Sequence, residues 1–464
     1  MKLKKVRVRN FKSIVDSGVV EVEPGVTVII GKNEQGKTTF LKALASWSPK
    51  ANYGPTDLPN HLRHTLERKK ASTIPIVTLW VTADPSELKK IGINDVGAER
   101  EFECTRFYDG HREYFTIGPN GDREQLKFSP PNFAKYADMA KSAANELKTK
   151  LQNHATRHPP FAAYLPQASA QIDQFSGANF NKPDEIDNLI KTFSTTIRSL
   201  PEQDAPIQEE IAAAINRIES AHAELRKVAA IDVSKLFEEA IPNFIFHSTT
   251  ATASEYVPNE VPIAEFVANP EQVSKGMANL CAVAGLSVQK IKELAESPDV
   301  IMRQTFEDTY NSTVSGGIND IWTQEKYDIQ FRFEPGKMFV SISDDTYSRR
   351  IAPRDRSDGF QWYLSFYSAI QSEGSASRST VFLLDNPGLE LHSDGQRDIK
   401  KYLEGLPNDQ VIYVTHSAAM IDPFRLEQVR QVERDLNCTP SLDQPAGFFS
   451  SREIRAGRVP LTVR

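Results

Sequence analysis

The stretch Gly31-Lys32-Asn33-Glu34-Gln35-Gly36-Lys37-Thr38 decides the fold, because it carries the complete G-x-x-x-x-G-K-[ST] pattern of a phosphate-binding loop. The β-branched run 26–30 precedes it and predicts a buried strand, and the run 39–44 that follows favours a helix. A strand, a loop and a helix in this order surround a polyphosphate with backbone N–H groups and a helix N-terminus. We therefore expect a nucleotide site here, within an α/β fold.

Each residue type in this loop has a predicted role at the nucleotide. The glycines let the backbone approach the phosphates, Lys37 reaches the β- and γ-phosphates, and the Thr38 hydroxyl ligates Mg²⁺. Further contacts to the nucleotide are expected from the loop and the start of the helix, at Asn33, Glu34, Gly36 and Thr39.

Two later strands are expected to complete the site. The apolar run 380–384 ends in Asp385, and the run 410–414 is followed by Thr415 and His416. A carboxylate at the carboxyl edge of a parallel sheet would lie beside the phosphate loop, where Asp385 can hold Mg²⁺. We expect His416 to sense the γ-phosphate, and the alternative is a histidine that only caps a strand end.

A second anion site is predicted just before the helix expected over 363–370. Ser357 is a good N-cap, and a serine and a glycine at a helix N-terminus bind anions. Lys37 already accounts for the phosphates of the chain's own nucleotide. We therefore expect Ser357 and Gly359 to reach ATP that is held by another subunit.

Composition argues against a membrane protein and against a globally basic DNA-binding protein. The 464 residues are 39% hydrophobic and 25% charged, and no apolar run approaches the roughly 20 residues that a spanning helix needs. The net charge of -6 leaves any DNA contact to a local basic patch. Cys104, Cys281 and Cys438 show no paired metal spacing, so we expect a reducing, cytoplasmic compartment.

The periodicity of the chain predicts three parts. Residues 1–130 are rich in strands, residues 131–240 read as helical, and residues 241–464 return to strands and contain the distal half of the site. Apolar residues at three- and four-residue steps form a stripe on one long helix: Ile207, Ile211, Ile215, Ile218 and Leu225, with His222 expected as a packed histidine. Such a stripe suits either a dimerisation element or ordinary core packing.

Together these motifs resemble the ABC-type ATPases of the RecF, SMC and OLD (overcoming lysogenisation defect) group, and OLD most closely. The resemblance covers nearly the whole chain. Residues 10–14, with Phe11 and Lys12, look like the family's motif near adenine, and residues 357–361 look like the start of its signature helix. Residues 384–392 look like the Walker B motif and the D-loop, and residues 415–417 look like the switch histidine segment. The resemblance implies an ABC-type P-loop ATPase head, a mixed sheet with an antiparallel β subdomain and a helical insert, and ATP and Mg²⁺ as cofactors.

The resemblance also implies partners and a biological role. In that family two heads close on two nucleotides, so we expect a homodimer or a higher oligomer. Many OLD proteins defend bacteria against phage, and many continue into a TOPRIM nuclease domain. Residues 417–464 are too few for that domain. We therefore expect no nuclease site here and a nuclease or toxin effector that is fused beyond the chain or separate, with DNA as a further candidate partner.

The sequence departs from the family where hydrolysis would occur. The family usually has glutamate directly after the Walker B aspartate, whereas this chain has Asn386, which can hold a water but cannot accept its proton. Glu390 is a candidate substitute, and the alternative is an exposed loop acid. Three hypotheses stay open: an ATPase that licenses a DNA nuclease in phage defence, an ATP-loaded scaffold that sequesters and releases an effector with little turnover, and a RecF- or SMC-like DNA repair ATPase.

Overall fold

The computed structural model describes residues 1–432 except for 64–69, 92, 94–98, 127, 129–132, 179, 181–182, 202–203, 230–231, 249–254, 298, 347–348, 375–378 and 407–408. The chain splits into two compact units. Unit 1 holds Met1–Ala83, Arg100–Gln125 and the chain from Ile241 onward, and unit 2 holds Asp84–Glu99 and Leu126–Ala240. The sequence division placed all of 1–130 in one part, whereas the structure groups 84–99 with the helices. Cys438 lies outside the described residues.

Five parallel strands form the central sheet of unit 1, in the order β15-β4-β14-β13-β9. Their bounds are β4 Val26–Ile30, β9 Asn243–Ser248, β13 Thr380–Asp385, β14 Gln410–Val414 and β15 Val429–Gln431. Every residue of β13 and β14 is buried, which is why these strands read as continuous apolar runs. Helix α1 (Lys37–Ala45) packs against β9, β13 and β14.

A seven-stranded antiparallel sheet forms the second layer of unit 1. Its strands are β1 Lys2–Phe11, β2 Ile14–Asp16, β3 Val20–Glu21, β5 Pro75–Ala83, β6 Arg100–Phe107, β7 Arg112–Ile117 and β8 Arg123–Gln125. The short helix α2 (Asn60–Arg63) lies between β4 and β5 in the sequence. β1 pairs antiparallel with both β2 and β3, so the first strands of the chain form an antiparallel hairpin. β1 also pairs with β5 on its other side.

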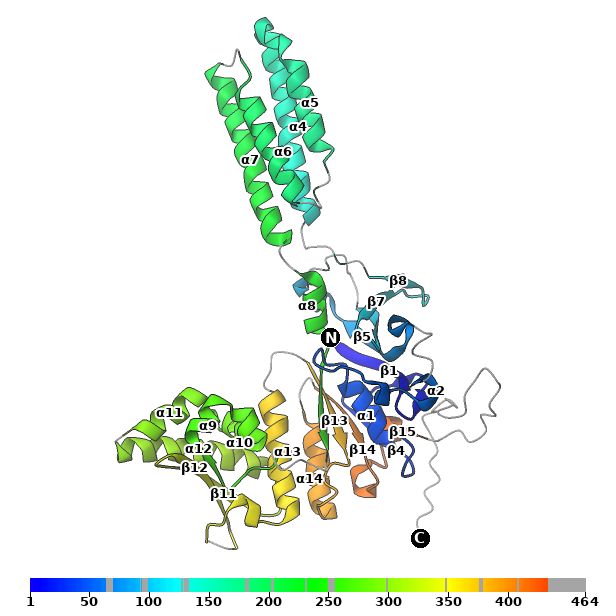
Figure 1. Ribbon diagram of the computed structural model, residues 1–464, viewed down its shortest axis with the longest axis vertical. Helices are drawn as coiled ribbons and strands as arrows, with labels where there is room; N and C mark the ends of the chain where they lie inside the picture. The colour runs from blue at the N-terminus through cyan, green and yellow to red at the C-terminus, as the bar shows by residue number, and fades with distance from the viewer. Residues whose placement is uncertain are drawn as a thin grey trace. The chain divides into compact units, whose positions relative to one another are not determined.

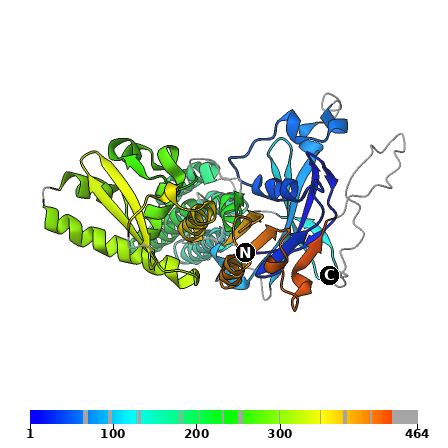
Figure 2. The same ribbon diagram turned by 90° about the horizontal axis from the view of Figure 1, so that it is seen from below.

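A smaller three-stranded sheet completes unit 1, in the order β10-β12-β11. β10 spans Glu260–Pro262, and the hairpin of β11 (Tyr327–Glu334) and β12 (Lys337–Asp344) is flanked by helices, as Figure 2 shows. The helices of this part are α9 Ile263–Ala268, α10 Pro270–Ala284, α11 Val288–Glu296, α12 Val300–Ile321, α13 Asp358–Gly374 and α14 Ser393–Glu404. One hydrophobic core joins them to the parallel sheet through Phe331, Trp362 and Phe382.

Unit 2 is built around four long helices that run side by side in Figure 1. They are α4 Phe133–Arg157, α5 Leu165–Ser176, α6 Pro183–Arg198 and α7 Ala205–Ala229, and the shorter α3 (Pro85–Lys90) and α8 (Val233–Ala240) belong to the same unit. The apolar stripe of α7 is buried in the core of this bundle, because α7 packs against α4 and α6. Dimerisation through this unit would therefore have to use another face.

His222 is a packed histidine, as expected: it is buried and its Nε2 lies 3.4 Å from Asp187 Oδ1. The predicted mixed α/β class is confirmed, since the chain combines a parallel sheet, an antiparallel sheet and a helical insert. Across the described parts of the chain, no helix is both long and apolar enough to cross a lipid bilayer.

Candidate functional site

The carboxyl edge of the parallel sheet brings the two halves of the predicted site together. Gly31 follows the end of β4, Asp385 ends β13, and Thr415 follows the end of β14. Val414 pairs with Ile29 on one side and with Asp385 on the other, so the three strands end at the same level. The N–H of Thr415 also donates to the carbonyl oxygen of Ile29 at 3.2 Å.

The phosphate loop needs glycine at its first position. A Cβ on Gly31 would lie 2.5 Å from the carbonyl oxygen of Val432, which is closer than any side chain tolerates. The side chains of Asn33 and Glu34 are exposed at the crest of the loop, and Thr39 is half-buried in the first turn of α1. Glu34 also adopts a positive φ of 61°. Such backbone strain at a non-glycine residue concentrates at ligand-binding turns.

Lys37 is held inside the curl of this loop. The residue is only 6% exposed, and Nζ donates to the carbonyl oxygens of Gly31 at 2.9 Å and Lys32 at 2.8 Å. Burial lowers the pKa of Lys37, and the nearby Asp385 carboxylate opposes that shift. The ammonium is thus positioned by the loop backbone, as phosphate binding at this position requires.

Thr38 and Asp385 form the pair that fits Mg²⁺. Thr38 Oγ1 donates to Asp385 Oδ1 at 3.0 Å, although the two residues are 347 positions apart in the chain. Adjacent oxygen ligands of an octahedral Mg²⁺ lie about 2.9 Å apart, given Mg–O distances of roughly 2.0–2.1 Å. A hydroxyl and a carboxylate at this spacing can both face one ion, with Asp385 acting directly or through a water.

Asn386 is fixed at the position that follows the aspartate. It has a left-handed φ of 54°, its N–H donates to Val414 at 2.9 Å, and its Nδ2 donates to Asp385 Oδ1 at 3.3 Å. Its Oδ1 is buried and accepts no hydrogen bond from the described residues. A buried carbonyl oxygen without a donor is the kind of acceptor that can hold a water. The amide therefore has a free acceptor but no basic site.

His416 lies at the exposed end of the same edge. Partial burial and the positive charge of Lys37 lower its pKa, and Asp385 opposes the shift. The imidazole therefore lies within electrostatic range of both the phosphate-loop lysine and the magnesium aspartate. A neutral imidazole in this position can accept or donate one hydrogen bond.

Gln396, which belongs to no sequence motif, connects the two loops of this edge. From α14 its Nε2 donates to the carbonyl oxygens of Gly388 at 2.9 Å and Leu391 at 3.2 Å, and its Oε1 accepts from Ser417 Oγ at 2.5 Å. The turn after Asp385 and the segment after His416 are thereby tied to one amide. A glutamine within a helix carries no motif, so only the fold identifies it.

Ser357 and Gly359 lie at the start of α13. Ser357 directly precedes the helix, its side chain is exposed, and its Oγ accepts weakly from the N–H of Phe360 at 3.4 Å. The helix begins earlier than the predicted 363–370. A Cβ on Gly359 would lie 2.8 Å from the carbonyl oxygen of Glu390, so the helix start packs closely on that turn. The side chain of Glu390 is exposed.

Phe11 and Lys12 form a turn with an unusual backbone. The φ of Lys12 is 51°, and its N–H donates to the carbonyl oxygen of Asp57 at 2.6 Å. The Phe11 ring is 4% exposed and packs edge-on against Tyr53, with 6.3 Å between centroids. Since the Phe11 ring is covered, exposed Lys12 is the better candidate for a contact with the nucleotide base.

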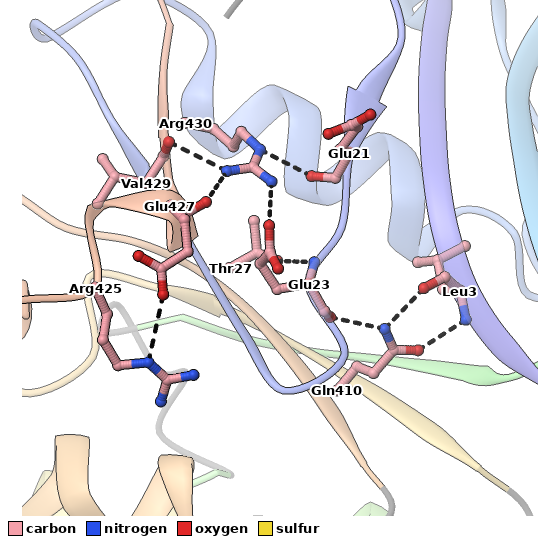
Figure 3. A network of polar contacts seen from close by, with 9 residues as sticks. All are labelled: Leu3, Glu21, Glu23, Thr27, Gln410, Arg425, Glu427, Val429 and Arg430. Carbon is pink, nitrogen blue, oxygen red and sulfur yellow. Dashed lines mark hydrogen bonds and ion pairs between the residues drawn. The ribbon is translucent and has the colours of Figure 1, made fainter. Parts of the chain in front are cut away.

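The amino edge of the same sheet carries a different polar network, drawn in Figure 3. Gln410 accepts from the Leu3 N–H at 2.8 Å and donates to the carbonyl oxygens of Leu3 at 2.8 Å and Glu23 at 2.9 Å. Buried Arg430 forms an ion pair with Glu23 at 2.6 Å and donates to the carbonyl oxygens of Glu21, Glu427 and Val429. These bonds fasten the first strands to the parallel sheet.

Comparison with solved structures finds distant likeness to SMC heads. The chain is similar to an Smc head bound to the C-terminal winged-helix domain of ScpA, with 10% identity, a TM-score of 0.40 and coverage of 94% of this chain and 95% of that chain. It is also similar to the SMC head domain from Thermotoga maritima, with 11% identity, a TM-score of 0.35 and coverage of 93% and 94%. Likeness at this level does not indicate a function.

Comparison with curated proteins found no match. Residues 1–158 match the family model described as the AAA ATPase domain. That stretch includes the phosphate loop, so the match supports an ATPase-type nucleotide site at the carboxyl edge of the parallel sheet.

Proposed function

We propose that this chain is an ATP- and Mg²⁺-dependent ATPase head of the OLD type, two copies of which close on nucleotide to control a DNA nuclease in phage defence. The nuclease would be fused beyond the chain or separate, and the assembly would act in the cytoplasm. Lys37 would hold the phosphates, Thr38 and Asp385 would hold Mg²⁺, and His416 would respond to the γ-phosphate.

The observation that carries the proposal is the 3.0 Å hydrogen bond between Thr38 and Asp385. A hydroxyl from the phosphate loop and a carboxylate from a distant strand meet within reach of Lys37, which is the charge arrangement that a magnesium-bound polyphosphate needs. Mg²⁺ supplies charge neutralisation of the phosphates when bound.

A second candidate function is favoured by Asn386. Its amide can orient a water but cannot take a proton, so turnover on this site would be slow. The chain would then be an ATP-loaded scaffold that holds an effector and releases it on sensing phage. In both functions Ser357 and Gly359 of one copy face the nucleotide of the other.

Closure is tested by ATP-dependent self-association. Light scattering should show that ATP and Mg²⁺ drive the wild-type chain into a dimer or higher oligomer. Ser357→Arg should bind ATP normally but fail to associate, because a long cation would fill the space in front of the second nucleotide. Ser372→Arg, at the other end of α13, is the matched control. Association that survives Ser357→Arg would overturn the proposed closure.

Turnover separates the two functions. Steady-state ATP hydrolysis is measured with and without double-stranded DNA, with Lys37→Ala as the blank. Hydrolysis above the blank that DNA stimulates supports the ATPase that licenses a nuclease. Tight ATP binding without turnover supports the scaffold. Absence of ATP binding by the folded wild-type chain would contradict both.

A further inference from the structure

A cluster of three possible metal ligands lies in unit 2, separate from the residues of the proposed nucleotide site. His154 lies in the last turn of α4, His158 directly follows the end of that helix, and Asp204 directly precedes α7. One ligand atom from each residue lies within 4.8 Å of the other two. No role in the proposed function uses these side chains.

The spacing of the donor atoms suits a small divalent cation. His154 Nδ1 is 3.8 Å from Asp204 Oδ1, and His158 Nε2 is 3.1 Å from Asp204 Oδ2. In a tetrahedral zinc site, with metal–ligand distances of roughly 2.0–2.2 Å, neighbouring ligand atoms are about 3.3 Å apart. The two observed separations lie on either side of that value, each to a different oxygen of Asp204, and one donor atom of each histidine lies within 4.8 Å of the other. Rotation of the side chains would bring one set of three donors to tetrahedral spacing.

The local structure holds all three side chains in place. His158 directly follows α4, its N–H donates to the carbonyl oxygen of His154 at 2.8 Å, and the two rings stack with 4.4 Å between their centroids. His154 is buried, where its ring packs edge-on against Phe161 at 4.9 Å. Asp204 is fixed as the cap of α7, because its Oδ1 accepts from the N–H of Ile207 at 3.0 Å. The donors are therefore preorganised by packing and capping.

We infer that His154, His158 and Asp204 form a Zn²⁺ site that joins the end of α4 to the start of α7. Two imidazole nitrogens and a carboxylate oxygen are ligands that zinc accepts in proteins, with water in the fourth position. His158 is 48% exposed on its side chain, which gives the ion a path from solvent. The ion would fasten one end of the helical bundle, since it links the first and last helices of the four.

The test is zinc binding by the full chain, without a polyhistidine tag, stripped with a chelator and kept free of nucleotide. Competition against a chromophoric chelator measures stoichiometry and affinity, and Co²⁺ absorption in the visible range reports tetrahedral nitrogen and oxygen ligands. The variants are His158→Ala and Asp204→Asn. Asparagine is as good an N-cap as aspartate, so Asp204→Asn removes the charged ligand while it keeps the start of α7. The control is His111→Ala, a half-exposed histidine of unit 1 that pairs with Asp109.

We expect one Zn²⁺ per wild-type chain and per His111→Ala chain. Both cluster variants should lose at least about tenfold in affinity and lose the Co²⁺ band, and Zn²⁺ should raise the thermal midpoint of the wild type but not of these variants. The inference is overturned if wild type and Asp204→Asn bind Zn²⁺ equally, or if the wild type binds none. The cluster would then be an ion pair built on a helix cap. Neither result depends on ATP binding, so it is distinguishable from failure of the proposed function.

Discussion

The two edges of the parallel sheet use polar residues in opposite ways. On the amino side, Gln410 at the start of β14 bonds to Leu3. The Arg430 guanidinium extends from β15, where the backbone is level with Ile29, to an ion pair with Glu23 and to carbonyl oxygens of neighbouring segments. At the carboxyl edge, Asn386 has a buried acceptor to which no described residue donates, and Lys37 Nζ donates to two carbonyl groups of the phosphate loop. Polar atoms that are satisfied by the chain itself contribute stability, whereas unsatisfied ones at a strained backbone mark a place for a ligand.

The largest expected effect is at the carboxyl edge, where Lys37→Ala should abolish ATP binding. The phosphates lose their principal cation, and we expect the affinity for ATP and Mg²⁺ to fall at least about 1,000-fold, or about 4 kcal/mol. Isothermal titration calorimetry measures this, with circular dichroism to show that the fold is intact. Lys42→Ala, an exposed lysine at the end of the same helix, should bind ATP as the wild type does. Unchanged affinity in Lys37→Ala would refute the assignment of the site.

On the amino side, removal of a cation should lower the stability of the fold and leave nucleotide binding unchanged. Arg430→Met keeps the apolar stem of the side chain but removes the ion-pair partner of Glu23 and the guanidinium that donates to three carbonyl groups. We expect a loss of about 3 kcal/mol in the free energy of unfolding, measured by urea denaturation, with ATP affinity unchanged. Arg425→Ala, which removes the exposed pair with Glu427, should change stability by less than about 1 kcal/mol. A loss of ATP affinity in Arg430→Met would remove the contrast between the two edges.

The carboxyl edge was predictable because its chemistry is local in sequence. Gly31, Lys37 and Thr38 lie in one motif, and Asp385 and Thr415 end apolar runs that a parallel sheet must align. The amino edge was not predictable, since Gln410 and Leu3 meet only through the fold, and neither belongs to a motif.

Contacts between segments that are distant in the sequence also explain two features of unit 2 that sequence patterns did not predict. The α7 stripe was visible as a pattern, but sequence could not say that α4 and α6 would cover it. Four-residue spacing could have drawn attention to His154 and His158. Their partner Asp204 lies just before the start of α7, and no sequence period connects it to the two histidines.

A smaller effect, on the rate of ATP hydrolysis, should show whether residue 386 at the carboxyl edge contacts the attacking water. Asn386→Glu supplies a carboxylate at the end of β13, and we expect the rate of ATP hydrolysis to rise about 100-fold, as general-base catalysis allows. The matched control is Asn386→Gln, which has the same size but no base and should leave the rate where it is. Both variants bear the same strain, because a longer side chain replaces an asparagine at φ 54°. If the two rates agree, residue 386 does not contact the attacking water.

The smallest expected effect is on the pH dependence of stability, and it comes from His247, which takes part in neither polar network. His247 precedes the last residue of β9, where it packs against Trp362 and Phe366 of α13, and its Nε2 is buried without a hydrogen-bond partner in the described structure. Burial lowers the pKa of His247 from 6.5 to about 4, and of the two charges that act on it, Glu255 opposes the shift while Lys275 adds to it. The ring is therefore neutral in the folded chain over most of the acidic range.

This pKa gives the pH dependence a definite sign. As the pH falls below 6.5, the unfolded chain binds a proton at His247 and the folded chain does not until about pH 4, so acid favours unfolding across that window. Between pH 7 and pH 5 the residue should remove about 2 kcal/mol from the free energy of unfolding. Urea denaturation at pH 7 and pH 5 should show a smaller fall in the free energy of unfolding for His247→Leu, because leucine does not bind a proton. The other titratable groups are shared with the wild type and cancel when the two falls are compared. If the free energy of unfolding falls equally in the wild type and in His247→Leu, the imidazole is not buried as described. Water would then reach the ring beside α13, or β9 would rearrange to expose it.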